Sequence, residues 1–538
     1  MLAGTIAQAL GDGTSDHFSD DDYEFLKFHG CYQQDDRDQR KTGKHYSLMV
    51  RTRFPGGVLT GPQYIVCDRL ASEYGNNTLR ITTRQDFQFH GVLKANLRET
   101  LRSLNEALMT TIAACGDVAR NVLASPTPST SVLVEEVLEQ ARRLSSALTP
   151  TTSAYHTIWV EGTELDLNSE ANRSFEDPLY RKDYLPRKFK AAFAIPPLND
   201  VDIYANDIGF IVIVENGQLA GYNLVAGGGL GMSHGNAQTF ARLADLIGFV
   251  HTEQLESVAK AVLTVHRDFG DRTNRKHARL KYVLEERGVE WFRAEVEKRA
   301  GLRFEPARPF EFTRQGDRLG WHEQLNGEWF LGLFVENGRV HDAADYKLKS
   351  GLREVVKQFA PGVRLTASQN LLLVNVKAEH RGRIDSILAD HGVSTSNPFS
   401  RTRLASMACP ALPTCGLALA ESERYLPSLL GSIDSLLTEV GLEGEELIIR
   451  MTGCPNGCSR PYLAELAFVG KAPNKYQLYL GGNEGSTRLN RLYKESVKGE
   501  EITNELRPLL IRYKNERLPG ERFGDFSARV LWNQVATS

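Results

Sequence analysis

The sequence lacks the features that direct a chain into or across a membrane. None of its apolar runs approaches the roughly 18 residues of a membrane-spanning helix. Its first residues, MLAGTIAQALGDG, contain no basic residue and only a broken apolar stretch, which is not the pattern of a signal peptide. We therefore expect a cytoplasmic protein that contacts no membrane.

Two further absences narrow the class of function. The formal net charge is only -3, so the chain has no overall basic footprint for nucleic acid, although basic residues can still gather locally. No G-x-G-x-x-G motif follows a predicted strand in a βαβ setting, and no flavin site is evident. A nicotinamide cofactor is therefore not expected on this chain. The run Gly227-Gly228-Gly229 is better explained by a close approach of the backbone to a ligand.

Cysteine is also scarce, but four of the seven cysteines form two close pairs. Five residues separate Cys409 from Cys415, and three separate Cys454 from Cys458. Four thiolates are the ligand set of a 4Fe–4S cluster or of a structural zinc site. Zinc ribbons mostly place two residues between paired ligands, so the spacing favours the cluster over zinc, and over four unrelated buried thiols.

The other three cysteines are most simply structural thiols: Cys31, Cys67 and Cys115. Thiols paired for metal in a chain of 538 residues indicate a reducing compartment.

The loop between the last two cysteines is suited to hold a metal cluster. Pro455 fixes its own φ angle, and Asn456 and Gly457 tolerate left-handed backbone, so a tight turn can bring both sulfurs to one side. Such a turn also directs backbone N–H groups at the sulfurs, which tunes the potential of a cluster.

This region resembles a known family. Residues 452–461, TGCPNGCSRP, together with the Cys-x5-Cys pair before them, are similar to the signature of sirohaem-containing sulfite and nitrite reductases. The resemblance implies that Cys409, Cys415, Cys454 and Cys458 hold a 4Fe–4S cluster. It also implies that Cys458 bridges the cluster to the iron of sirohaem.

An internal repeat suggests how the chain is built. Residues 79–92 and 363–376 share a pattern in which Arg80, Gln85 and Val92 return as Arg364, Gln369 and Val376. We read residues 79–92 as one strand, with Arg80 and Arg84 on the same face. With the resemblance, the repeat implies an α+β, pseudo-two-fold duplicated sulfite/nitrite reductase fold, with ferredoxin-like half-domains and mixed sheets around sirohaem.

The expected parts of the chain follow from this duplication, in the order N-terminal arm, first ferredoxin-like half repeat, first sirohaem domain with the anion pocket, second half repeat, and second sirohaem domain with the cysteines. Their expected bounds are residues 1–40, 41–115, 116–310, 311–395 and 396–538. The first half is expected to supply basic residues where the second half supplies cysteines.

Helical periodicity predicts several helices between these motifs. They are expected at residues 63–74, 133–147, 235–248, 253–264, 274–299 and 417–440. The basic run 274–281 is most simply the charged face of the helix that contains it. The polar run 32–38 is a solvated loop on its chemistry alone, although it also resembles a segment near the cofactors in the sulfite reductase side of the family.

The resemblance also implies an anion pocket of four cations: Arg51, Arg120, Lys188 and Lys190. Arginine presents a fixed fork to oxyanions, and a lysine crowded by other cations can lose its proton. Lys188 and Lys190 are two residues apart, so they share a face of an extended segment. Any one of these residues alone would be more simply explained as a surface cation.

Sirohaem is a polycarboxylate, so burying it requires matched cations. Arg80 and Arg84 are candidates for that role, with Gln88 and His90 nearby as further cofactor-binding candidates. His90 is equally explained as a satisfied core histidine, and we do not assign it as an axial ligand.

The expected activity is the six-electron reduction of sulfite to sulfide in sulfate assimilation, with sirohaem and a 4Fe–4S cluster as cofactors. Lys190 favours sulfite, because the nitrite reductases of the family tend to carry Asn at this place. A sirohaem nitrite reductase is the second hypothesis, and a zinc-stapled nucleic-acid-binding protein is the third. Electrons would come from a separate NADPH-dependent flavoprotein or from ferredoxin.

Overall fold

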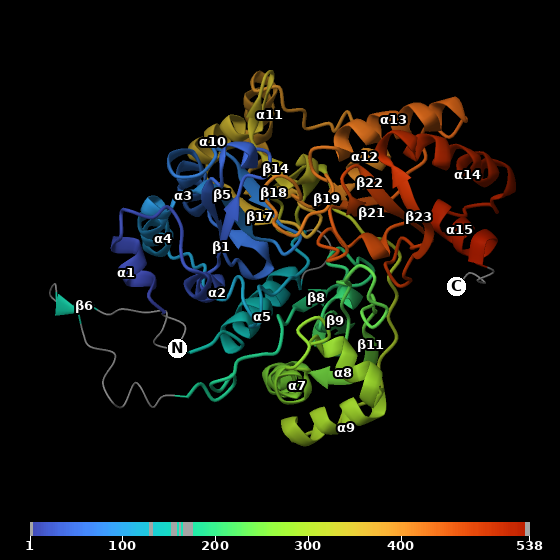
Figure 1. Cartoon of the computed structure of the whole chain (residues 1–538). Helices are drawn as coiled ribbons and strands as arrows, with labels where there is room; N and C mark the ends of the chain where they lie inside the picture. Colours follow the sequence, from blue (N-terminus) through green and yellow to red (C-terminus); the bar gives the residue numbers. More distant parts are fainter. Residues whose placement is uncertain (1–3, 129–132, 152–158, 161–162, 165–175, 533–538) are drawn as a thin grey trace.

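The computed structural model describes residues 4–128, 133–151, 159–160, 163–164 and 176–532. Three groups of elements meet in the middle of the molecule (Figure 1). One contains the N-terminal elements together with α10 and α11, one contains the sheet that begins with β8, and one contains the C-terminal sheet that begins with β19. No helix in the described part of the chain is long and apolar enough to cross a membrane.

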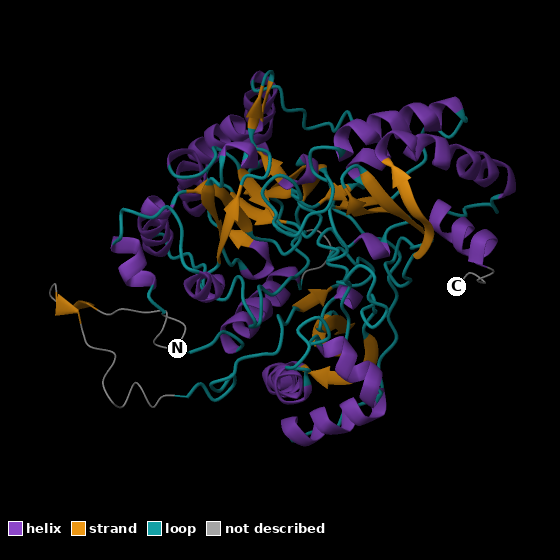
Figure 2. Ribbon diagram, viewed as in Figure 1, coloured by secondary structure: helices purple, strands orange, loops and turns teal. Residues whose placement is uncertain are grey.

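The larger helices cover the outer faces of the sheets (Figure 2). Their bounds are α3 Gly61–Glu73, α4 Leu97–Glu106, α5 Val134–Ala147, α7 Leu255–Phe269, α8 Leu280–Arg287, α9 Val289–Ala300, α10 Leu348–Phe359, α11 Arg381–Asp390, α13 Leu426–Glu439, α14 Ile502–Glu516 and α15 Phe523–Trp532. The shorter ones are α1 Ile6–Gly11, α2 Asp20–Phe28 and α12 Arg401–Leu404.

Two five-stranded sheets carry the internal repeat, and each borrows one edge strand from the other half of the chain. The first has the order β1-β2-β5-β4-β14 and the second β12-β13-β18-β17-β3. Their bounds are β1 Cys31–Asp35, β2 Tyr46–Arg51, β3 Val58–Leu59, β4 Leu79–Ile81, β5 Phe87–Val92, β12 Gly320–Glu323, β13 Trp329–Leu333, β14 Arg339–Val340, β17 Gly362–Leu365 and β18 Leu371–Val376.

The predicted repeat is present, but the prediction of one continuous strand over residues 79–92 is wrong. A tight turn separates β4 from β5, and Gln85 in this turn has a φ of 57°. Its counterpart Gln369 has a φ of 72° in the turn between β17 and β18. Because the turn interrupts the alternation of side chains, Arg80 and Arg84 do not share a strand face.

Two further sheets repeat each other at the centre of the molecule. One has the order β11-β10-β9-β8, in which β8 and β9 are parallel and the other neighbours antiparallel. The other has the order β19-β20-β21-β22-β23, in which β19, β20 and β21 are parallel and the remaining neighbours antiparallel. Their bounds are β8 Ala191–Ala194, β9 Ile208–Glu215, β10 Gln218–Ala226, β11 Asp245–His251, β19 Met407–Ala408, β20 Ile449–Thr452, β21 Leu466–Ala472, β22 Lys475–Leu480 and β23 Arg491–Lys498. The mixed α+β, duplicated fold expected from the sequence is confirmed.

Some predicted helices differ from those observed. No helix forms over residues 235–248, which are irregular before β11, because β11 pairs with β10 and this pairing overrides the local helical pattern. The predicted helix 274–299 starts late, at Leu280, and is divided at Gly288, whose φ is 81°. The basic run 274–281 therefore lies mostly in a loop and not on a helix face.

One hydrophobic core is shared by the two half repeats and joins them into one body. It contains Leu70, Leu79 and Phe89 from the first repeat and Leu352 and Leu373 from the second, all buried. Because each sheet alone leaves one apolar face uncovered, burying these faces together favours folding of the halves as a unit. The exact domain bounds expected from the sequence stay a prediction.

Candidate active site

The four paired cysteines come together because two parallel strands end side by side. Cys409 directly follows β19, and Cys454 follows β20, which pairs with β19 in parallel. Cys415 and Cys458 stand in the turns that continue these two strands. The four thiols lie close to one another: burial raises the pKa values of Cys409, Cys415 and Cys454, and negative charge on Cys458 raises all three further.

The surroundings of these thiols suit metal-bound thiolates. Burial raises the pKa of Cys409 to about 11 and that of Cys454 to about 12, and the negative charge of the neighbouring thiolates adds to both effects. The Gly453 N–H donates to Cys409 Sγ over 3.3 Å, and Asn456 Nδ2 donates to Cys454 Sγ over 3.6 Å. Donors aimed at sulfur stabilise thiolates that a positive metal centre would otherwise have to hold alone.

The arrangement fits a cluster better than a zinc ion. A single zinc ion needs four ligands about 2.0–2.3 Å from one centre. Among the described residues, no three His, Cys, Asp or Glu side chains converge in such a way. A 4Fe–4S cluster takes one thiolate at each of its four iron corners, so it fits a more widely spaced set of sulfurs.

A cavity of about 410 Å³ borders the cysteine loop, and we call it the cationic cavity. Cys458 and Asn456 form part of its wall. Eight of its described lining residues are basic, and none is Asp or Glu. The basic residues are Arg84, Arg187, Lys188, Lys190, Arg275, Lys276, Arg279 and Arg460. A buried polycarboxylate needs such a wall, so the residues present fit sirohaem.

Lys188 and Lys190 enter this cavity from the extended segment that leads into β8. Phe189 between them is buried in the core, which turns both lysines toward the opposite side. Burial lowers the pKa of Lys188 to about 7, with further lowering by the charges of Arg187 and Arg120. The pKa of Lys190 is also well below its usual value, first through burial and then through Lys188. The cavity therefore concentrates positive charge, which a bound anion would neutralise.

Arg51 and Arg120 stand beside the cationic cavity and are not among its lining residues. Both guanidinium groups donate to the Ala114 carbonyl, at 3.5 Å from Arg51 Nη1 and 3.1 Å from Arg120 Nη1. Arg120 Nε also donates to the Gly116 carbonyl at 2.9 Å. Burial lowers the pKa of Arg51, but the nearby negative charges outweigh it and leave this pKa raised; they come from Cys115, Tyr32, Asp86 and Cys458. The structure therefore brings the two arginines together and places them close to Lys188 and Cys458.

The four residues predicted to support the cofactor divide into two groups. Arg84 lines the cationic cavity and is fixed by Asn206 Oδ1 at 3.0 Å. Arg80 is absent from that wall, because its guanidinium pairs with Glu423 at 3.0 Å and donates to the Ala408 carbonyl behind the cysteine loop.

Gln88 and His90 lie on β5, away from the cationic cavity wall. With its amide oxygen turned toward Arg51, Gln88 accepts from Arg51 Nε at 3.1 Å and donates to His90 Nε2 at 3.3 Å. Burial lowers the pKa of His90 to about 3, so the ring is neutral. Its place matches that of a core histidine that helps to hold Gln88.

Sequence reasoning missed several basic residues of the cavity. Arg275, Lys276 and Arg279 belong to the basic run that the sequence predicts to be the charged face of a helix, and the structure shows this prediction to be wrong. Their loop is tied down by ion pairs: Arg275 with Asp117 at 2.6 Å and Arg279 with Asp207 at 2.8 Å. The dense positive charge of this run could have indicated a binding site. The carboxylates that hold the run in place, however, are distant from it in the sequence.

Arg460 belongs to the cysteine signature, but the sequence alone predicts no role for it. It adopts left-handed backbone with a φ of 55°, pairs with Asp202, and donates to the Thr83 and Ala367 carbonyls at 3.2 and 3.0 Å. Arg37, in the polar run 32–38, donates to the Ala418 carbonyl at 2.6 Å. Residues of the first half thus hold the cysteine loops of the second.

Comparison with known proteins gives the same assignment for almost the whole chain. The family model "Nitrite/Sulfite reductase ferredoxin-like half domain" matches residues 38–107 and 322–391, and "Nitrite and sulphite reductase 4Fe-4S domain" matches residues 139–304. Proteins named "Sulfite reductase (NADPH) hemoprotein beta-component" from Geobacillus kaustophilus and Myxococcus xanthus are each 50% identical to this chain. The match covers 98% of this chain and 93% and 94% of those proteins.

A solved structure, that of the NirA protein of Mycobacterium tuberculosis, has the same fold, with a TM-score of 0.80 at 22% identity. The match covers 98% of this chain and 94% of that one. The half-domain model matches both copies of the repeat that the two five-stranded sheets show. The chain therefore belongs to the nitrite and sulfite reductase family.

Proposed function

We propose that this protein is the haemoprotein component of a sulfite reductase, which reduces sulfite to sulfide with six electrons. One observation carries the proposal: Cys458 faces a cavity whose described wall is basic and free of carboxylates. The relatives that share half of its residues over nearly the full length bear the name of this enzyme, which supports the choice of sulfite.

The cofactors would be held by the residues described above. Cys409, Cys415, Cys454 and Cys458 would hold a 4Fe–4S cluster, with Cys458 shared with sirohaem, and the basic wall would neutralise the sirohaem carboxylates. When bound, this pair supplies stored electrons and an open iron position. The side chains of the chain must then bind the substrate and deliver protons.

Lys188, Lys190, Arg51 and Arg120 would share these tasks. The two arginines offer planar forks of donors that orient an oxyanion. A lysine whose pKa is lowered toward neutrality, as that of Lys188 is, can give up a proton to a leaving oxygen and regain one from solvent. Arg187 and Arg279 add positive charge that draws anions into the cationic cavity.

The preference for sulfite over nitrite would depend on Lys190. Sulfite carries more negative charge than nitrite, so a second lysine beside Lys188 favours it. We expect Lys190→Asn to lower kcat/KM for sulfite more than for nitrite, with Lys182→Asn on the exposed surface as the matched control. Sulfide and ammonium production from the two anions measures this, and an unchanged ratio would remove the argument.

Electrons would come from a separate flavoprotein that oxidises NADPH, as the names of the relatives suggest, and ferredoxin is the alternative donor. Adding a purified NADPH-dependent flavoprotein should produce sulfide from sulfite. If reduced ferredoxin supports turnover and the flavoprotein does not, the donor assignment is wrong and the site assignment stands. The cytoplasmic location expected from the sequence stays a prediction.

A further inference from the structure

Asp86 is a buried carboxylate beside the predicted anion pocket. It stands at the end of the tight turn between β4 and β5 and is 1% exposed. The Phe54 N–H donates to Asp86 Oδ1 at 3.0 Å, and the Asp86 N–H donates to Thr82 Oγ1 at 3.2 Å. These bonds fix the carboxylate against the segment that directly follows Arg51 at the end of β2.

The second repeat forms the same turn with a neutral side chain. Asn370 takes the place of Asp86 in the turn between β17 and β18. The Val335 N–H donates to Asn370 Oδ1 at 2.9 Å, and the Asn370 N–H donates to Thr366 Oγ1 at 3.0 Å. Because an amide oxygen accepts the same bond, the turn does not need the negative charge of Asp86. The four predicted cations of the anion pocket all belong to the first half, where this charge stands.

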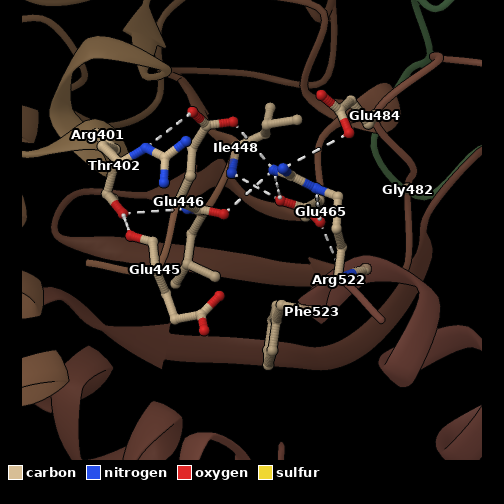
Figure 3. Close-up of polar contacts among 12 residues, drawn as sticks. Arg401, Thr402, Glu445, Glu446, Ile448, Glu465, Gly482, Glu484, Arg522 and Phe523 are labelled. Carbon is tan, nitrogen blue, oxygen red and sulfur yellow. Dashed lines mark hydrogen bonds and ion pairs between the residues drawn. The ribbon is translucent and has the colours of Figure 1, made fainter. Parts of the chain in front are cut away.

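Buried carboxylates that hold the frame of this protein are in direct contact with a cation. Glu465 pairs with Arg522 at 3.0 Å (Figure 3), and Asp207 pairs with Arg279 at 2.8 Å. Among the described residues Asp86 has no such partner, and arginines act on it only through their charge. An ionised carboxylate that is buried without a direct partner is costly, so it takes up a proton readily.

The arginines that act on Asp86 come from β2, from the segment after it and from the turn itself. Burial raises the pKa of Asp86 to about 7, although the Phe54 N–H and the charges of Arg51, Arg84 and Arg53 lower it. Arg84 lines the cationic cavity, and Arg51 stands beside it. The protonation of Asp86 is therefore sensitive to any charge that binds at these arginines.

A bound anion changes this balance in one direction. Negative charge beside Arg51 offsets the positive charge that keeps Asp86 ionised, so the carboxylate takes a proton from solvent. The coupling is reciprocal, because an ionised Asp86 weakens anion binding by the same factor by which the anion favours protonation.

We propose that Asp86 couples anion binding to proton uptake: when the substrate anion binds at Arg51, the Asp86 carboxylate takes one proton from solvent and becomes a neutral carboxyl group. It returns this proton when the anion leaves or is consumed. Asp86 acts through Arg51 and does not touch the substrate, so it is a positioning residue. The inference rests on the proposed function, because it takes Arg51 to belong to the anion site.

Nitrite is the probe, because it remains a monoanion near neutral pH and is not reduced without an electron donor. Isothermal titration calorimetry of the oxidised holoprotein at about pH 7, repeated in buffers of different ionisation enthalpy, gives the number of protons taken up per nitrite. We expect up to about half a proton per nitrite, because a group at its pKa is half protonated. Infrared difference spectra with and without nitrite should show a new band of a protonated carboxyl group.

Asp86→Asn should remove both signals and still fold, because Asn370 makes the same turn bond in the other repeat. It should also tighten nitrite binding at about pH 8 by roughly tenfold, the change that corresponds to one pKa unit of coupling. Asp390→Asn makes the same chemical change at an exposed position of α11 and should leave proton uptake and affinity unchanged. Thermal unfolding of each variant shows that it is folded before titration.

Saturable nitrite binding to wild-type protein without proton uptake would overturn this inference and leave the proposed function intact. Proton uptake that persists in Asp86→Asn would do the same, since another group would then carry the proton. Wild-type holoprotein that binds no nitrite would contradict the anion site itself, and the inference with it.

Discussion

Lys188→Met should stabilise the cofactor-free protein while it damages the enzyme. Without an anion beside it, Lys188 shares a cavity wall with Arg187, Lys190 and Arg279, and its folded pKa is lowered from 10.5 to about 7. Each pKa unit corresponds to about 1.4 kcal/mol, and the residual exposure of the side chain reduces this. We therefore expect the free energy of unfolding to rise by about 2–4 kcal/mol at pH 7.

The pH dependence fixes the sign of this effect. The folded pKa of Lys188 lies below the unfolded pKa, so the unfolded chain binds more protons between about pH 7 and 10.5. The penalty is complete below pH 7 and disappears above 10.5. The stability of wild-type protein should therefore gain on that of Lys188→Met as the pH rises through this window.

Urea unfolding of protein made without sirohaem, followed by tryptophan fluorescence at pH 6.5 and at pH 9.5, measures both effects. Lys182→Met, at an exposed lysine, is the matched control and should change stability by less than about 0.5 kcal/mol. In the holoprotein Lys188→Met should reduce sulfite turnover by about 10²-fold or more. Equal stability of wild type and Lys188→Met at both pH values would refute the crowding of charge in the cationic cavity.

Three further predictions concern the frame of the site. Asp207→Asn leaves Arg279 without its buried partner and should destabilise the protein by about 3–5 kcal/mol in chemical denaturation. Gly228→Ala puts a Cβ 2.1 Å from a main-chain oxygen and should lower the free energy of unfolding by several kcal/mol. Gly431→Ala lies in open space on α13 and should raise the free energy of unfolding by about 0.5–1 kcal/mol. Thermal unfolding of both variants measures the difference. Two arginines lower the pKa of Glu423 to about 2, so the stability it contributes is present above its unfolded pKa and lost as pH falls toward 2, and Glu423→Gln should remove that part of the acid sensitivity.

The sequence allowed correct predictions where a feature depends on a short, continuous motif. The spacing of the four cysteines and the turn residues Pro455 and Gly457 were enough to expect a cluster loop, because spacing and turn chemistry are local properties. The repeat of Gln85 at Gln369 was readable for the same reason: each occupies a position with positive φ inside a hairpin. The roles assigned to Arg51, Arg120, Lys188 and Lys190 stay predictions, supported by their proximity.

Features that depend on contacts between residues far apart in the chain could not be predicted from the sequence. The loop with Arg275 and Arg279 faces the cavity only because Asp117 and Asp207, far apart in the chain, hold it there. Arg80 looked like Arg84 in the pattern, but its partner Glu423 comes from the other half of the molecule. Local propensity likewise predicted a helix over 235–248, where sheet pairing decides the outcome.

The central claim is that Cys458 joins a cluster to sirohaem beneath a basic pocket. Mössbauer spectroscopy of iron-57-labelled holoprotein tests it most directly. We predict that the haem iron and the four cluster irons are magnetically coupled in the wild type. We also predict that Cys458→Ser abolishes this coupling, whereas Cys67→Ser, at a buried thiol outside the site, preserves it. Uncoupled iron centres in the wild type, or coupling that survives in Cys458→Ser, would contradict the account.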